Sequence, residues 1–409
     1  MTVGFYLSKI QPSDGGIYQY SIYVLKMLLK CSEIEKIYIF HSFNQVVEFE
    51  QYLSHPKVKV VLHDRNGKLY NFLKKTSEFY LTRFYLKRMS YRFHYMLYNL
   101  LNPDRRFLNR YNLDVLHVPR QHSPAYNLKF PVIISMHDVQ QFHFPEFFSP
   151  IERIYKSIRY FTTMSEANHV IVSYDHVKVD LKKYFRDVKT DVSVCPVPMD
   201  EDWVSGKPAT GADELMKKYG IPDQIILTPA ATWEHKNHMA VLEALVQLRS
   251  EGLRIFWVST GNKTGFYPTL EKKVNALGLN DQVLFTGVVP DADLLGLYKM
   301  ARLVVIPTLY EAGSGPLFEA MRYQSPVICS NVTSLPETIG NPEFVFEPGN
   351  SRQIAEYIKR GLTDDAYKKR NLENSEQRIS YFKNLNYAPA FIEAYQKAML
   401  VFRTNRIVE

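Results

Sequence analysis

The sequence predicts an α/β protein made of two Rossmann-like domains, each a doubly wound parallel sheet. Short apolar runs alternate with helical patterns along the chain, and 409 residues are too many for one ordinary domain. Strands that are apolar throughout and separated by helices indicate a parallel sheet covered on both faces. Ligands bind at the carboxyl ends of the strands in such domains, so two domains that face each other would enclose a cleft.

The first predicted domain spans residues 1–200. Its expected strands follow in the order TVGFYLS (2–8), KIYIFHS (36–42), VKVVLHD (58–64), DVLHVPR (114–120), VIISMHD (132–138), HVIVSY (169–174) and DVSVCPVP (191–198). The alternation of strands and helices is less regular here than in the second half.

The second predicted domain spans residues 201–385 and is joined to the first near 200–222, where WVSGKPATGADE has the composition of a linker. Its expected strands are QIILTPAA (224–231), RIFWVST (254–260), QVLFTGV (282–288), LVVIPT (303–308), PVICSN (326–331) and FVFEP (344–348). Residues 386–409 form a third segment, in which Phe391, Tyr395, Ala398 and Phe402 share one face of an amphipathic helix. This helix either caps the second domain or packs back on the first, which is the arrangement we expect.

The composition excludes several classes of protein. With 46% hydrophobic and 22% charged residues, the chain is not disordered, collagen-like or a disulfide scaffold. Three scattered cysteines without a CxxC pair indicate a reducing compartment and no structural zinc. No apolar run reaches the ~18 residues of a membrane span, and the N-terminus reads as a strand rather than a signal peptide. We therefore expect a cytoplasmic protein, or one bound peripherally to the inner face of the cytoplasmic membrane.

The richest motif is LVVIPTLYEAGSGPLFEAMRYQSPVICSNVTSLPE (303–337). It places Glu311 after a strand, then a glycine-rich turn, then Glu319 in the first turns of a helix that begins at a proline. The turn gathers backbone N–H groups and the positive end of the helix into a site for phosphate, and a carboxylate such as Glu319 can accept from sugar hydroxyls. The alternative is an ordinary turn with two surface glutamates.

This motif resembles the E-x7-E region of the retaining, nucleotide-sugar-dependent glycosyltransferases of family 4, also called group 1, which have the GT-B fold. SNVTSLPE matches the continuation of that region, and TPAATWEHKNH (228–238), SMHDVQQFHFPEFFSP (135–150) and SDGGIYQY (13–20) match three further family motifs in the expected order. The resemblance implies that residues 1–200 form the acceptor side of the cleft and that residues 201–385 bind the nucleotide sugar. It also implies that Glu311 contacts the donor sugar and Glu319 the ribose. It implies a donor site formed by Gly15, Gly16, Lys236, Glu311, Gly313, Ser314, Gly315, Pro316, Leu317 and Glu319.

Lys236 lies in a loop at the mouth of the second sheet, where a cation would stabilise the departing diphosphate. The arginine that many relatives carry five residues earlier is Ala231 here, and either His235 or Arg322 could replace it. A surface lysine with no ligand is the alternative.

Two features of the first domain belong to the same prediction. Gly15 and Gly16 follow the first strand and allow a backbone to approach the diphosphate or the sugar closely, unless they form a plain turn. His137 follows a buried strand and could hydrogen-bond a sugar hydroxyl, with Asp138 orienting it, although a structural histidine is the alternative. The predicted catalytic residues are His137, Glu311 and Lys236.

No metal or other cofactor is expected. Asp291-Ala292-Asp293 imitates a DxD metal motif, but an aspartate before a helical run reads as an N-cap.

The positive charge is concentrated in one segment. The chain carries +8 overall, while residues 51–110 hold 13 basic and 3 acidic residues. Aromatic residues (Phe84, Tyr91, Tyr95 and Tyr98) alternate there with Lys87, Arg88 and Arg92, a mixture that suits an anionic membrane surface or a membrane-bound acceptor. A solvated helix with buried aromatics is the alternative, and the absence of a nucleic-acid module argues against nucleic acid as a partner.

The sequence thus predicts a retaining, metal-independent hexosyltransferase. Its donor would be a nucleotide-diphosphate sugar, such as GDP-mannose or a UDP-sugar, and its acceptor a glycan or a lipid-linked glycan in the assembly of O-antigen, capsule or exopolysaccharide. A sugar-nucleotide epimerase of the GT-B fold and a non-catalytic nucleotide-sugar-binding protein are the alternatives.

Overall fold

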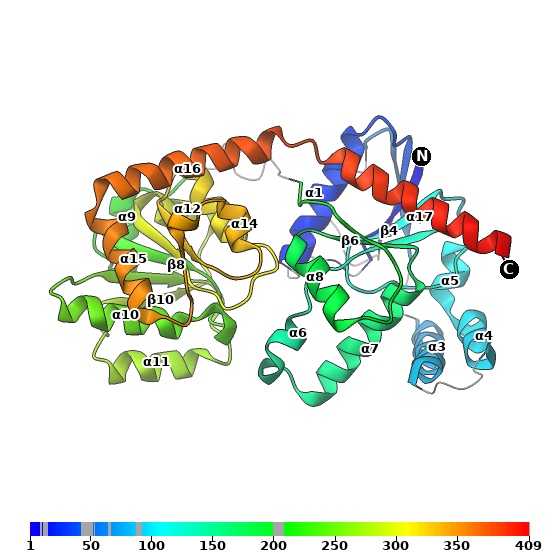
Figure 1. Ribbon diagram of the computed structural model, residues 1–409, viewed down its shortest axis with the longest axis horizontal. Coiled ribbons are helices and arrows are strands. Elements are labelled where there is room, and N and C mark those ends of the chain that lie inside the picture. The colour runs from blue at the N-terminus through cyan, green and yellow to red at the C-terminus, as the bar shows by residue number, and fades with distance from the viewer. Residues whose placement is uncertain are drawn as a thin grey trace. The chain divides into compact units, whose positions relative to one another are not determined.

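The structure is a computed structural model that describes residues 1–8, 10, 15–41, 52, 54–63, 67–86, 92–198 and 208–408. The chain divides into two compact units. Unit 1 comprises Met1–Met199 and Asn386–Glu409, and unit 2 comprises Asp200–Leu385. Figure 1 shows that each unit has a sheet with helices packed around it.

Unit 1 contains a parallel sheet with the strand order β3-β2-β1-β4-β5-β6-β7. The strands are β1 (Thr2–Tyr6), β2 (Lys36–His41), β3 (Val58–Leu62), β4 (Val115–Val118), β5 (Val132–Ser135), β6 (His169–Val172) and β7 (Val192–Val194). Its helices are α1 (Gly16–Lys30), α3 (Lys68–Leu86), α4 (Arg92–Leu101), α5 (Pro103–Leu108), α6 (Gln140–His143), η2 (Pro145–Phe147), α7 (Pro150–Glu166), α8 (Asp175–Tyr184) and α17 (Ala388–Val408).

The two faces of this sheet bury separate cores. Side chains alternate along a strand, so Phe5 and Val115 point to one face while Tyr6 and Leu116 point to the other. The first core is completed by α1 and by α17, whose Phe391, Ile392, Ala394, Tyr395 and Ala398 are buried. The second core is completed by side chains of α5, α7 and α8.

The C-terminal helix α17 therefore belongs to unit 1. It contacts β4, β5, β6 and β7, although more than 180 residues of unit 2 precede it in the chain. The apolar face expected from the sequence is the face that packs, except that Phe402 is only half-buried.

Unit 2 contains a parallel sheet with the strand order β10-β9-β8-β11-β12-β13. The strands are β8 (Ile225–Pro229), β9 (Phe256–Thr260), β10 (Val283–Gly287), β11 (Ala301–Ile306), β12 (Val327–Ser330) and β13 (Val345–Phe346). The helices are α9 (Ala212–Tyr219), η4 (Glu234–Lys236), α10 (His238–Ser250), α11 (Tyr267–Ala276), α12 (Asp291–Met300), α13 (Gly315–Arg322), α14 (Leu335–Ile339), η5 (Pro342–Phe344), α15 (Ser351–Thr363) and α16 (Asp365–Asn384). Figure 1 shows α12 and α14 on one side of this sheet and α10 and α11 on the other.

The predicted fold of two doubly wound parallel sheets is confirmed, but the predicted linker near 200–222 is too long. Its second half is α9, which buries Leu215 and packs on α12. The helix carries acidic residues in its first turn and lysines in its last, and it ends at Gly220 with φ of 64°. Acidic residues favour the start of a helix, and lysines and a glycine favour its end. The polar composition of the segment is also typical of a linker, so composition alone does not reveal this helix.

Two positions in this topology matter for ligand binding. The order of the strands reverses between β1 and β4 in unit 1 and between β8 and β11 in unit 2. At each reversal the loops leave the sheet in opposite directions and open a crevice at the carboxyl ends of the strands.

None of the described helices has both the length and the apolar character needed to cross a bilayer.

Candidate active site

The predicted residues of the second domain gather where β8 and β11 end. These strands are neighbours in the sheet, and Lys236 follows β8 while Glu311 follows β11. Both residues therefore lie at the reversal of strand order in unit 2, the position at which doubly wound sheets bind ligands.

Lys236 and Glu311 form an ion pair. The Nζ of Lys236 donates to Oε2 of Glu311 at 2.6 Å, and the two side chains are 20% and 14% exposed. A short charge-assisted hydrogen bond with this little solvent is stronger than a pair on the open surface. The ammonium group has three donors and the carboxylate two oxygens, so both groups keep capacity for a ligand.

Hydrogen bonds hold the two loops that carry this pair. The carbonyl of His235 accepts from Thr308 Oγ1 at 3.0 Å. Asn237 has a left-handed backbone, with φ of 59°, and its amide group donates to the carbonyl of Pro307 at 2.9 Å. These bonds tie the loop after β8 to the loop after β11 and fix where Lys236 and Glu311 meet.

Two hydroxyl groups fix the backbone of Glu311. The hydroxyl of Thr333 accepts from the amide of Glu311 at 3.0 Å and donates to its carbonyl at 2.7 Å. Ser334 donates to the same carbonyl at 3.0 Å. The string SNVTSLPE contains both residues, but nothing in its spacing indicated that they support Glu311.

The N-terminus of α13 offers backbone donors beside this pair. Ser314 is the N-cap, and its hydroxyl accepts from the amide of Leu317 at 3.3 Å, so that predicted donor amide is already engaged. Pro316 has no amide hydrogen. Within the described ranges, no hydrogen bond uses the amides of Gly313, Ser314 or Gly315. These three amides are the ones available to an anion.

Glu319 lies in α13 and is paired with a tyrosine that the sequence did not single out. The hydroxyl of Tyr298 donates to Oε2 of Glu319 at 2.5 Å. Burial is the main reason that the pKa of Glu319 is raised to about 7. The hydrogen bond from Tyr298 lowers the pKa, and the nearby carboxylate of Asp291 raises it. A carboxylate with a raised pKa becomes more favourable when hydroxyl groups of a ligand donate to it.

The predicted residues of the first domain also lie close to one another. Gly15 has φ of 57°, a left-handed conformation that favours glycine, and α1 starts at Gly16. One turn later, the ring of Tyr20 contacts the ring of His137 edge-on, with the centroids 4.7 Å apart. The Nε2 of His137 lies 3.1 Å from the carbonyl of Pro119, and burial lowers the pKa of this histidine. A neutral His137 that donates from Nε2 keeps Nδ1 as an acceptor.

A buried hydrogen-bond chain lies behind His137. The hydroxyl of Tyr20 bonds Ser135 at 2.9 Å, Ser135 bonds His117 Nε2 at 2.9 Å, and His117 Nδ1 bonds the hydroxyl of Tyr395 at 2.8 Å. Burial lowers the pKa of His117 to about 3, so its ring is neutral. This chain connects α17 to the side chain that contacts His137.

Comparison with known proteins identifies the second unit. The family model described as "Glycosyl transferases group 1" matches residues 212–378. Residues 212–378 are a group 1 glycosyltransferase domain. The predicted resemblance is thus confirmed, and the matched range includes the Lys236–Glu311 pair and Glu319.

Relatives of this glycosyltransferase chain include two proteins of Escherichia coli. O-antigen chain mannosyltransferase B is 26% identical over 386 residues, which cover 93% of this chain and 96% of that protein. Serotype-specific mannosyltransferase WbdA is 31% identical over 190 residues, which are 45% of this chain and 23% of that protein. A solved glycosyltransferase from Rickettsia africae superimposes with a TM-score of 0.66 at 17% identity, over 97% of this chain and 98% of that one. This structural likeness shows the GT-B fold.

The missing clamp arginine of this glycosyltransferase is not replaced by a charged histidine. Burial and, to a lesser extent, the positive charge of Lys236 lower the pKa of His235 to about 4. His235 is therefore neutral near pH 7 and cannot supply the second cation, which corrects one of the two expected substitutes for Ala231. Arg322 stays a prediction.

The interpretation of Asp291-Ala292-Asp293 as an N-cap is also wrong in detail. The N-cap of α12 is Pro290, and no side chain caps the helix. Asp293 is buried, and it accepts hydrogen bonds from Thr210, Lys218 and Tyr219, each at 2.6 Å. Asp293 therefore joins α9 to α12. The short string Asp291-Ala292-Asp293 could not predict this structural role, because its partners lie more than 70 residues earlier in the chain.

The aromatic side chains that the basic segment of unit 1 exposes are not the ones that the sequence predicts. Tyr98 is buried, and Tyr95 is half-buried with its hydroxyl donating to Glu166. Lys87 and Arg88 lie outside the described residues, and Arg92 starts α4 without a described side chain. Among the described residues of α3 and α4, the exposed large apolar side chains are instead Leu69, Phe72 and Phe79 of α3 and Phe93, Met96 and Leu100 of α4.

Proposed function

We propose that the protein is a retaining hexosyltransferase that uses a nucleotide-diphosphate sugar in the assembly of a surface polysaccharide. The Lys236–Glu311 pair, beside the available amides of Ser314 and Gly315, is the observation that carries the proposal. Cleavage of the sugar–phosphate bond leaves negative charge on a diphosphate. A cation and the positive end of a helix at one place stabilise that charge as it develops.

The residues divide the work as follows. Lys236 and the amides at the start of α13 hold the diphosphate, Glu311 accepts from hydroxyls of the donor sugar, and Glu319 accepts from the ribose. His137, with Nε2 directed to Pro119, offers Nδ1 to a sugar hydroxyl. The departing diphosphate takes the proton of the acceptor hydroxyl on the face from which it leaves, so retention needs no second carboxylate, in contrast to a glycosidase. The protein supplies position and charge.

We further propose that the hexose is mannose, carried by GDP. Both relatives described above bear the name mannosyltransferase, and one of them aligns over nearly the full length of both chains. By the same reasoning the acceptor is a glycan of the O-antigen type, free or linked to lipid.

A donor panel tests this proposal. GDP-mannose should raise the melting temperature of the protein more than UDP-glucose, because a ligand that binds only the folded state stabilises it by mass action. Addition of acceptor should then give a product whose anomeric configuration, measured by NMR, equals that of the donor. Lys236→Ala should abolish transfer, whereas Lys272→Ala, at an exposed lysine of α11, should not. Inverted product would refute retention, and epimerised donor without acceptor would favour the epimerase.

The α3–α4 surface is the part of the protein that we propose to contact an anionic membrane. It consists of the exposed Leu69, Phe72, Phe79, Phe93, Met96 and Leu100, each between 52% and 69% exposed. Residues 69, 72 and 79 lie along one side of α3, and 93, 96 and 100 along one side of α4, at helical spacing. Lys68, Lys75 and Arg83 are exposed on α3, with the guanidinium of Arg83 over the ring of Phe79 at 4.5 Å.

Apolar side chains bordered by cations suit the headgroup layer of an anionic bilayer. Each Lys or Arg near such a surface contributes about 1 kcal/mol, so several together give a reversible attachment that salt weakens. The protein should therefore co-sediment with vesicles that contain anionic lipid at low salt and stay in the supernatant at high salt.

Two sets of variants separate the contributions to this attachment. Phe72→Ser with Phe79→Ser should reduce sedimentation while Val179→Ser, at an exposed valine of α8, should not. Replacement of Lys87, Arg88 and Arg92 by glutamine should also reduce co-sedimentation with anionic vesicles, as the two phenylalanine replacements do. Wild-type protein that stays in the supernatant at low salt would exclude this surface as a membrane contact.

A further inference from the structure

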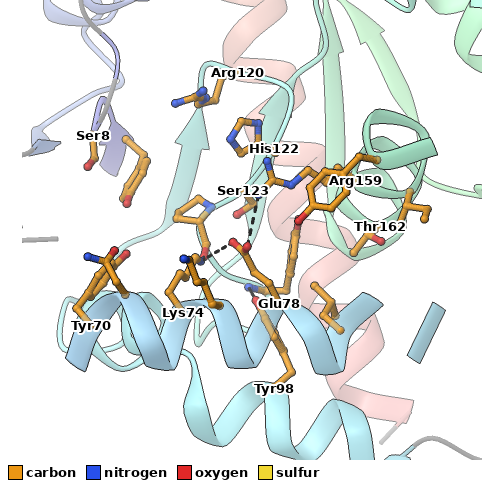
Figure 2. A pocket seen from close by; sticks show the side chains of 18 residues that line it. Ser8, Tyr70, Lys74, Glu78, Tyr98, Arg120, His122, Ser123, Arg159 and Thr162 are labelled. Carbon is orange, nitrogen blue, oxygen red and sulfur yellow. Dashed lines mark hydrogen bonds and ion pairs between the residues drawn. The ribbon is translucent and has the colours of Figure 1, made fainter. Parts of the chain in front are cut away.

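Unit 1 contains a pocket of about 320 Å³ that no part of the proposed donor site uses. Figure 2 shows its walls: Ser8 near the end of β1, Arg120 and His122 on the loop after β4, Tyr70, Lys74 and Glu78 on α3, and Arg159 and Thr162 on α7. The strands β1 and β4 flank the reversal of strand order in unit 1, so the pocket occupies the position where a doubly wound sheet binds a ligand. Its volume is near the lower end for small-ligand sites, which suits a compact ligand head.

The pocket has an excess of positive charge. Its walls include four cationic side chains and one carboxylate, Glu78; the cations are Lys74, Lys75, Arg120 and Arg159. Glu78 is shared, because Lys74 lies 3.8 Å and Arg159 3.6 Å from it. Behind the wall, the buried Asp104 accepts from Lys74 at 2.8 Å. Among the described charged side chains of the pocket and its wall, four cations face two carboxylates, and this excess of positive charge suits an anionic phosphate group.

Internal bonds hold Lys74 in place, whereas Lys75 is exposed. Lys74 also donates to the carbonyl of Pro124, so its ammonium group is fixed in the wall. Lys75 is exposed and, among the described residues, forms no ion pair. Arg159 is 42% exposed, and its guanidinium lies 5.2 Å from the ring centroid of Tyr155. Lys75 and Arg159 are therefore the cations that can turn toward an anion without breaking a buried bond.

The remaining walls suit a sugar rather than a bare ion. Tyr155, at the rim, is 53% exposed and presents an aromatic side chain. Polar side chains that can donate or accept hydrogen bonds surround the space, among them Ser8, Asn71 and His122. Aromatic surface with a few directed polar groups is the usual lining of a site for a small polar ligand.

We infer that this pocket binds a saccharide that bears a phosphate group, with the phosphate at Lys75 and Arg159 and the sugar toward Tyr155. The inference rests on the proposed function, for which it specifies the acceptor: a glycosyl phosphate, either free or as the head of a lipid. The helix α3 favours the lipid form, because it contributes Lys74 and Lys75 to the pocket and Leu69, Phe72 and Phe79 to the exposed apolar line. One helix thus borders both a site for an anionic sugar and a surface for apolar chains.

Binding measurements on the full-length protein, saturated with GDP so that the donor site is filled, test the inference. Calorimetry would compare N-acetylglucosamine 1-phosphate and glucose 1-phosphate with the free sugars and with inorganic phosphate. We expect each sugar phosphate to bind at least about tenfold more tightly than either half alone, since charge and sugar contacts add. Lys75→Gln with Arg159→Gln should weaken the sugar phosphates about tenfold. Lys182→Gln, at an exposed lysine of α8, should leave them unchanged.

The source of the phosphate is tested with vesicles. Neutral vesicles that carry a lipid-linked glycosyl phosphate should retain the wild-type protein and compete with the soluble sugar phosphate, if the ligand is a lipid head. Equal binding of sugar phosphate to wild type and to the double variant, or no binding at all, would overturn the inference. GDP titration separates this failure from failure of the proposed function: GDP should bind both proteins equally, and absence of GDP binding would count against the donor site instead.

Discussion

Replacement of Glu319 by glutamine should make unit 2 more stable at alkaline pH while it weakens nucleotide binding. The pKa of Glu319 is about 7 in the folded protein, against an ordinary value of 4.5, because burial disfavours the carboxylate. Between these two pH values the folded chain binds more protons at this site than the unfolded chain. Stability due to this group is therefore complete below pH 4.5 and is lost as the pH rises through about 7. Glutamine keeps an oxygen that can accept from Tyr298 but has no charge to bury.

The magnitude follows from the same shift. A difference of about 2.5 pH units corresponds to about 3.4 kcal/mol at 1.36 kcal/mol per unit. Because the residue is only half-buried by area, solvent screens part of this, and we expect about 1–2 kcal/mol. For a unit of this size that is a difference of about 2–8 °C in melting temperature between the variant and the wild type at pH 8, relative to pH 5.

Tryptophan fluorescence is a suitable probe, because all three tryptophans, Trp203, Trp233 and Trp257, belong to unit 2. Trp257 is fully buried in β9, so its emission should shift when this unit unfolds. Urea unfolding at pH 5 and pH 8 would give the stability of wild type and Glu319→Gln at each value. The reasoning would be refuted by parallel pH dependences in the two proteins.

Four further outcomes are expected. Affinity for GDP should increase from pH 6 to pH 8 in the wild type and stay constant in Glu319→Gln, measured by calorimetry, because only the carboxylate accepts from both ribose hydroxyls; a flat wild-type profile would contradict this. Glu311→Ala should lower kcat by roughly tenfold to a hundredfold with a smaller change in the Kd of GDP, since a charged hydrogen bond contributes about 1.5–3 kcal/mol; unchanged turnover would remove Glu311 from the site. Activity should survive EDTA, and loss that manganese or magnesium restores would show a metal requirement. Asp293→Ala should destabilise unit 2 by about 2–4 kcal/mol in urea, because it leaves three donors without their acceptor, whereas Asp291→Ala should have a smaller effect.

The sequence predicts strands and site residues of this protein to different degrees, for physical reasons. Strands such as Ile225–Pro229 are buried on both faces, so their apolar runs are unambiguous. Lys236 and Glu311 are predicted because they lie in the loops that follow such strands and because those loops resemble family motifs. Tyr298, Thr333 and Asp104 act through contacts between distant segments, and no local spacing encodes those contacts.

The aromatic residues of the basic segment show the same limit. Period and composition indicate that a helix has aromatic side chains, but the neighbouring elements decide which of them are covered. Tyr98 is buried against Leu81 and Tyr126, and its hydroxyl accepts from the amide of Tyr126 across a sequence separation of 28 residues. Phe93, five residues before Tyr98 in the same helix, is exposed.

The position of α17 has a consequence for the order in which the protein folds during its synthesis. The hydrophobic core on one face of the first sheet needs Phe391, Tyr395 and Ala398, which leave the ribosome after all of unit 2. Unit 2, residues 200–385, can therefore fold before the helix α17 that completes unit 1 has been synthesised. Until then the apolar sides of α1 and of strands β4 to β6 stay exposed in the nascent chain, and exposed apolar surface of this kind is prone to aggregation. A premature stop shortly before residue 388 would leave unit 2 intact and make unit 1, which is synthesised first, the unit that fails to fold.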